Sequence, residues 1–105
     1  MPEPAVFRAI AHPTRRSILD TLTGGERSVG ELCDRFDVTQ PAISQHLEVL
    51  REAGLVQARA VGRQRLYALD PAPLQEVFDW TARFEAFWQE RFDRLGHVLD
   101  REATR

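Results

Sequence analysis

The first half of the chain carries apolar residues at helical spacing. Ile18 and Leu22 lie on one face of a stretch that opens at Pro13 and ends at a pair of glycines. Proline fits a first helical turn because its missing N–H is not needed there, and glycine commonly ends helices. The pattern predicts a helix over residues 13–23, and a shorter helix is expected before it over residues 4–10.

Two more helices follow, each preceded by a residue that can cap it. Ser28 and Glu31 have the spacing of a capping box, so a short helix is predicted from residue 29 to about residue 35. After a brief turn, Thr39 can cap another helix, which continues to about Ala53. Its apolar stripe consists of Ile43, Leu47 and Leu50. Gly54 then stands where a helix commonly ends.

Beyond that glycine the pattern changes from helical to strand-like. Residues 55–60 and 65–69 are typical of short strands, and Gly62 lies in the turn between them. This predicts a hairpin over about residues 55–69. After a proline-containing break, a long helix is predicted over about residues 74–100, roughly 40 Å in length.

The order of these elements predicts the fold class. About five helices and a two-stranded hairpin make the chain mainly α. A short helix, a turn, a longer helix and then a hairpin form the arrangement of a winged helix-turn-helix, in which the hairpin is the wing. We expect a single winged-helix DNA-binding domain over residues 1–105, because 105 residues and 12.0 kDa suffice for one domain.

Composition narrows the class of protein. No apolar run approaches the ~20 residues that span a bilayer, so no membrane partner is expected. The first ten residues lack the pattern of a secretory signal, and a cytoplasmic location is therefore expected. Cys33 is the single cysteine, which excludes a disulfide within one chain.

Charge is distributed unevenly along the chain. The formal net charge of −2 argues mildly against nucleic acid as a partner. However, residues 39–68 contain four arginines against two acidic residues, whereas residues 71–105 contain five arginines against seven acidic residues. The basic stretch coincides with the longer helix and the hairpin.

The polar face of the helix over residues 39–53 has the side chains that major-groove recognition needs. Gln40 and Gln45 can each bond two atoms of adenine, and Ser44 can pair with several base edges. Thr39 and Gln40 are placed for phosphate contacts from the first turn. The alternative interpretation is an ordinary solvated helix face.

The predicted hairpin strengthens the DNA-binding interpretation. Arg59, Arg63 and Arg65 surround its glycine turn and could lie along phosphates or enter a narrow minor groove. Taken alone, such a hairpin is as often an ordinary charged hairpin as a DNA-binding wing. Arg15 and Arg16, near the start of the second helix, could contact phosphate or be solvated.

Four stretches of this chain resemble ArsR-type (ArsR/SmtB-like) winged-helix transcriptional regulators. They are Ala11–Leu19, Gln40–Leu47, Leu50–Val56 and Gly62–Tyr67. The resemblance implies a homodimeric repressor that binds an operator in double-stranded DNA and is usually released by an inducer, here an unknown small molecule. It places Gln40, Ser44, Gln45 and His46 on the family's DNA-reading stretch, and Arg63 and Arg65 on its wing. A packed or bridging role for His46 is an open alternative.

Metal sensing, common in that family, is not expected here. Glu31-Leu32-Cys33 matches the first half of a family metal site, but Arg35 stands where the second thiolate would be. Cys33 is expected to be a buried small hydrophobe. On the last helix Asp93, His97 and Asp100 share a face but offer only one imidazole, so we expect neither a metal site nor a cofactor.

The last helix is unusually aromatic. Within fifteen residues it carries Phe78, Trp80, Phe84, Phe87, Trp88 and Phe92. Surplus apolar area of this kind marks an interface, so we expect a dimer in which this helix pairs with the first one. The residues expected from the first helix are Val6, Phe7 and Ile10. A ligand pocket between the aromatics is an alternative, and the Trp-bearing helix resembles that of a metal-independent subgroup.

The dimer predicts the mode of DNA binding. Two-fold symmetry presents two recognition helices about 34 Å apart to an inverted repeat. An enzyme is not expected, because no third orienting group, phosphate loop or paired carboxylates accompany Cys33 and His46. A winged helix used only for protein contacts, and a metal- or thiol-responsive repressor of this fold, remain alternatives.

Overall fold

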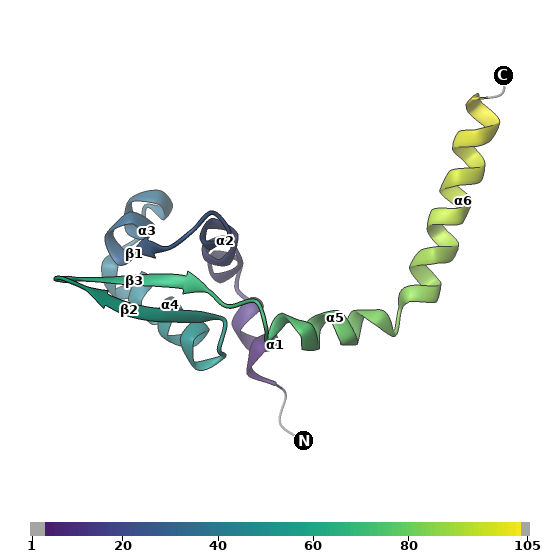
Figure 1. Cartoon of the computed structure of the whole chain (residues 1–105). Helices are drawn as coiled ribbons and strands as arrows, with labels where there is room; N and C mark the ends of the chain where they lie inside the picture. Colours follow the sequence, from purple (N-terminus) through teal and green to yellow (C-terminus); the bar gives the residue numbers. More distant parts are fainter. Residues whose placement is uncertain (1–3, 104–105) are drawn as a thin grey trace. The chain divides into compact units, whose positions relative to one another are not determined.

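The computed structural model describes the backbone of residues 4–103 and the side chains of residues 4–96. Its helices are α1 (Ala5–Ile10), α2 (Pro13–Leu22), α3 (Val29–Phe36), α4 (Gln40–Glu52), α5 (Leu74–Ala82) and α6 (Glu85–Ala103). Its strands are β1 (Arg27–Ser28), β2 (Val56–Val61) and β3 (Gln64–Leu69), as Figure 1 shows. Two compact units result, one up to Gln75 and one from Glu76 onward.

The core of the first unit is built by α1 to α4 and the sheet. The predicted apolar stripe of α4, Ile43, Leu47 and Leu50, is fully buried. The other fully buried large side chains are Ile18, Leu32, Leu55 and Val56. Burying each such side chain contributes about 1.5–3 kcal/mol. Because one face of α4 is fixed in this core, its opposite face is held at the surface.

The capping box that the sequence predicts before α3 is confirmed. The backbone N–H of Glu31 donates to Ser28 Oγ (3.2 Å), and the backbone N–H of Ser28 donates to Glu31 Oε1 (3.1 Å). Ser28 is also the last residue of β1 and pairs with Leu66 of β3. One residue therefore joins the sheet to the first helix of the helix-turn-helix.

Replacing Ser28 by alanine is expected to lower the free energy of unfolding by about 1 kcal/mol, the usual cost of losing an N-cap side chain. Urea unfolding of the purified protein measures it. Ser17→Ala is the matched control, because Ser17 is exposed inside α2, where alanine is the better helix former. Equal losses from both substitutions would contradict the capping role.

The wing differs from the two-stranded hairpin predicted from the sequence. The sheet has three antiparallel strands in the order β1-β3-β2. The added strand β1 is only two residues long and pairs through Arg27 with Tyr67 and through Ser28 with Leu66. A strand this short carries no detectable alternation in the sequence. The predicted turn is present, and Gly62 has φ +60°, as the first central residue of a type II′ turn does.

The prediction of a single long helix over residues 74–100 is wrong, because two helices lie there, which brings the helices within residues 4–103 to six. Helices α5 and α6 are separated at Arg83 and Phe84. The Thr81 hydroxyl donates to the Phe78 carbonyl (2.8 Å), and the N–H of Phe84 donates to Thr81 O (3.0 Å). Side-chain bonds of this type compete with the helical ladder and bend helices. None of the described helices has the length and apolar character needed to cross a membrane.

Candidate nucleic-acid interface

The exposed face of α4 presents a row of polar side chains. Gln40, Ser44 and Gln45 are exposed, and among the described residues none of their side chains has a hydrogen-bond partner. Thr39 caps the helix, because its Oγ1 accepts from the N–H of Ala42 (3.4 Å). That bond uses a lone pair only, so the Thr39 hydroxyl can still donate to an acceptor outside the protein. The structure thus brings four predicted residues together at one end of α4.

His46 lies differently from these residues. It is half-buried, its ring centroid is 4.6 Å from that of His12, and its Nδ1 is 3.4 Å from Arg15 Nη1. Burial, and then the charges of His12 and Arg15, lower the pKa of His46. His46 therefore lies between His12 and Arg15, as the bridging alternative expects, and its assignment to DNA reading stays a prediction.

Arg15 and Arg16 have a structural role that the sequence did not reveal. Arg15 donates from Nε to Ala9 O (2.7 Å) and from Nη2 to Arg8 O (3.0 Å). Arg16 donates from Nη1 to Ile10 O (2.8 Å). Carbonyls in the last turn of a helix lack helical partners, so the two arginines cap the C-terminal end of α1.

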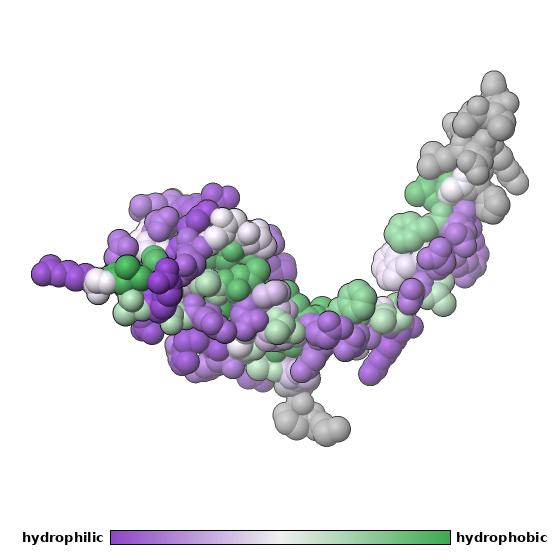
Figure 2. All heavy atoms as spheres, viewed as in Figure 1, coloured by the Kyte–Doolittle hydropathy of each residue, from purple (hydrophilic) through white to green (hydrophobic). Residues whose placement is uncertain are grey.

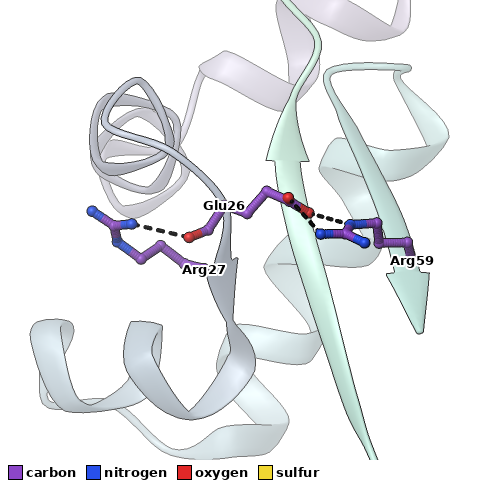
Figure 3. Close-up of polar contacts among 3 residues, drawn as sticks. All are labelled: Glu26, Arg27 and Arg59. Atoms are coloured by element: carbon purple, nitrogen blue, oxygen red, sulfur yellow. Dashed lines mark hydrogen bonds and ion pairs between the residues drawn. The ribbon is translucent and has the colours of Figure 1, made fainter. Parts of the chain in front are cut away.

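The wing arginines fall into two groups. Arg59 is paired with Glu26, with Nε–Oε2 and Nη2–Oε1 distances of 2.7 and 2.9 Å. Figure 3 shows the Glu26 side chain crossing β3 to reach Arg59 on β2. The hydrogen bonds from Arg59 lower the pKa of Glu26, so this carboxylate stays charged. Arg59 is therefore already neutralised within the chain.

Arg63 and Arg65 carry the remaining charge of the wing. Both are exposed, and within the described part of the chain neither has an ion-pair partner. Arg63 lies in the turn beside Gly62, while the Arg65 guanidinium lies 6.0 Å from the Tyr67 ring centroid. Arg51 is paired with Glu48 and Arg59 with Glu26, so Arg63 and Arg65 are the arginines of residues 39–68 outside any ion pair of the described residues. The hydrogen bond from Arg51, with a smaller effect of the charge of Arg65, lowers the pKa of Glu48.

The second unit exposes large aromatic side chains. Phe78 is 67% exposed and Trp88 is 52% exposed. The other exposed aromatics are Trp80, Phe84, Phe87 and Phe92. Figure 2 shows hydrophobic atoms at the surface along α5 and α6. An open concavity of about 460 Å³ between these helices is lined by Phe78, Thr81, Ala82, Glu85, Trp88, Gln89 and Phe92.

The three α1 residues that were expected at a dimer interface differ in how exposed they are. Val6 is only 3% exposed and packs in the core of its own chain, so it offers almost no surface to a partner. Phe7 and Ile10 are half-buried and keep part of their surface. The sequence could not separate these three, because a six-residue helix is too short to define its buried face.

The candidate metal ligands are not assembled in the described part of the chain. No group of three or more His, Cys, Asp or Glu side chains there could hold a metal ion. Cys33 is half-buried, not fully buried as expected. Asp93 accepts from Gln89 (3.5 Å), whereas the side chains of His97 and Asp100 lie outside the described residues.

Known proteins have sequences similar to that of this chain. A helix-turn-helix domain family matches residues 10–57. The transcriptional repressor SdpR of Bacillus subtilis (strain 168) is 38% identical over 79 residues, which are 75% of this chain and 88% of SdpR. The HTH-type transcriptional regulator Rv2034 of Mycobacterium tuberculosis (strain H37Rv) is 38% identical over 96 residues, covering 91% of this chain and 87% of that protein.

A solved structure agrees with these relatives. The crystal structure of an ArsR family transcriptional regulator matches this chain with a TM-score of 0.72 at 33% identity, covering 81% of this chain and 88% of that one. These relatives are regulators of transcription and not enzymes. With its α3–α4 pair and three-stranded wing, this chain belongs to the ArsR-type winged helix-turn-helix transcriptional regulators.

Proposed function

We propose that this chain is a homodimeric, sequence-specific DNA-binding repressor that recognises an inverted-repeat operator. The observation that carries the proposal is the exposed row of Gln40, Ser44 and Gln45 on α4, next to a wing whose free charge is concentrated in Arg63 and Arg65. A relative named as a transcriptional repressor, SdpR, supports the same direction of regulation.

In this proposal the first turns of α4 enter the major groove. The amide of Gln45 bonds the N6 and N7 atoms of an adenine, and Ser44 contacts a neighbouring base edge. Thr39 and Gln40 contact the phosphate backbone beside the helix N-terminus. Arg63, at the turn of the wing, neutralises phosphate along the adjacent groove.

The exposed aromatics supply the dimer. Monomeric proteins rarely expose large apolar patches, and aromatic residues are enriched in interface cores. We assign the interface to the exposed aromatics of α5 and α6, and we assign a separate contribution to Phe7 and Ile10 of α1. An isologous dimer places two copies of α4 about 34 Å apart, which selects an inverted repeat.

A titration against DNA tests the proposed function. The purified protein is titrated with the DNA upstream of its own coding sequence and with random DNA, at two salt concentrations, with and without chelator. Preference for the upstream fragment that survives chelator is expected. Binding only after metal addition would support a metal-responsive repressor. No binding to either DNA would contradict the proposal and favour a protein-contact module.

Arg63→Gln is expected to reduce the slope of log K for DNA binding against log salt concentration by about one unit per wing, because one phosphate contact is lost. The affinity for operator DNA and the affinity for random DNA should fall by similar factors. The measurement is the slope of log K against log salt concentration.

Arg59→Gln is the matched control for that prediction. It removes an arginine from the same hairpin, but one whose charge Glu26 already neutralises, so its slope should change less than that of Arg63→Gln. Equal changes in the two variants would contradict the assignment of phosphate contact to Arg63.

A further inference from the structure

Three side chains from two helices meet at the start of α2. His12 is the N-cap of α2, Arg15 lies in its first turn, and His46 projects from α4. The rings of His12 and His46 have centroids 4.6 Å apart, and Arg15 Nη1 lies 3.4 Å from His46 Nδ1. We call these three residues the imidazole cluster.

The hydrogen bond between Arg15 and His46 within the imidazole cluster requires a neutral His46 ring. Arginine can only donate, so His46 Nδ1 must be the acceptor and carry no proton. The backbone N–H of Thr14 donates to His12 Nδ1 (3.1 Å), which holds the His12 ring beside that of His46. The His46 ring therefore keeps its single proton on Nε2, and a proton added at its Nδ1 would face the Arg15 donor.

Arg15 connects the imidazole cluster to a third helix. Its Nε and Nη2 groups hold the carbonyls of Ala9 and Arg8 at the end of α1, while its Nη1 group holds His46 on α4. One guanidinium thus ties α1, α2 and the recognition helix together. A proton on His46 would break the only one of these bonds that reaches α4.

The charges around His46 oppose its protonation. The causes that lower its pKa below the ordinary value of 6.5 are, in order, burial, His12 and Arg15. No carboxylate in the described part of α1, α2, α3 or β2 figures among them. Because the folded pKa is depressed, the folded arrangement is favoured above pH 6.5 and loses stability as pH falls from there through the folded pKa.

We propose that the imidazole cluster is a proton-sensitive clamp in which Arg15 is a positioning residue that holds α4 in place, so that acidification reduces the preference for operator over random DNA. The inference rests on the proposed function. Added positive charge strengthens binding to all DNA, whereas displacement of α4 weakens only base recognition. The ratio of the two affinities separates these effects.

The test measures affinities for operator and random DNA at fixed salt between about pH 8 and about pH 5.5, the range in which histidine titrates. The ratio of the two affinities is expected to fall about three- to tenfold, the range given by one net hydrogen bond. His46→Gln keeps an acceptor for Arg15 but cannot titrate, so its ratio should stay flat. In His97→Gln, which alters the remaining histidine, the ratio should fall with pH as it does in the wild type.

A second variant and a DNA-free measurement guard against a folding defect in His46→Gln. His12→Asn keeps a capping acceptor and removes the second imidazole. The fall in the ratio of operator to random-DNA affinity on acidification should therefore become smaller. In the free protein, NMR titration of the imidazole protons should give His46 a pKa below that of an exposed histidine, with backbone shifts in α2 and α4 that follow it.

Two outcomes would overturn the clamp. One is a ratio that does not change with pH in a protein that prefers its operator at about pH 8. The other is a pH-dependent rise in affinity for both DNAs that His46→Gln abolishes, which would make the cluster a phosphate contact. Absence of operator preference at every pH would instead contradict the proposed function.

Discussion

Trp88→Glu is expected to dissociate the proposed dimer and to lower operator affinity by about a hundredfold, since central aromatic residues each contribute about 2–4 kcal/mol to interfaces. Trp88 lines the concavity between α5 and α6 and contacts Phe87 and Phe92, with ring centroids 5.6 and 6.5 Å apart. Two-fold symmetry buries the introduced carboxylate twice. Sedimentation measures the mass, which should fall to the 12.0 kDa of one chain.

Ala86→Glu is the matched control for this substitution. Ala86 is exposed on the same helix, two residues before Trp88 and therefore about 200° around its axis. It introduces the same side chain on the opposite face, and the variant should remain dimeric and bind the operator as the wild type does. A Trp88→Glu protein that stays dimeric would contradict the assigned interface.

Gln45→Ala is expected to weaken operator binding by about ten- to a hundredfold per half-site, because a bidentate contact to one base contributes about 1–3 kcal/mol of discrimination. Ser44→Ala should have a smaller effect in the same direction. Affinity for random DNA should change little in both variants, since neither residue is charged. Parallel titrations against operator and random DNA measure the difference.

Gln57→Ala provides the comparison for this pair of substitutions. Gln57 is an exposed glutamine of β2 that donates to Asp70 Oδ2 (3.1 Å), outside the polar face of α4. Its replacement should leave operator preference intact. Equal losses on operator and random DNA in Gln45→Ala would overturn base recognition by this face.

Local signals explain what the sequence predicted well. The capping box of Ser28 and Glu31, the N-cap at Thr39 and the turn at Gly62 each depend on residues within four positions of one another. The interior stripe of α4 follows from helical periodicity alone. For the same reason, the exposed polar face of α4 could be predicted before any tertiary contact was known.

The parts that escaped prediction depend on distant partners or on competing bonds. Arg59 and Glu26 are 33 positions apart, and nothing near Arg59 in the sequence indicates that its charge is neutralised. Arg15 has its hydrogen-bond partners on α1 and α4. The sequence around Arg15 would be the same if this arginine were solvated or bound to phosphate. The break before α6 follows a threonine, not a glycine or proline, so no strong breaker marked it.

The two ends of the sheet differ in how much change in chain length they can absorb. At Ser28 there is no spare residue between strand and helix, because the same residue ends β1 and caps α3. At Gly62 nothing lies within 4 Å of where a side chain would begin, so the turn has open space around it, although its φ of +60° favours glycine. We therefore expect a change in chain length to be tolerated better at the turn of the wing than at Ser28, where it would shift α3 relative to the sheet.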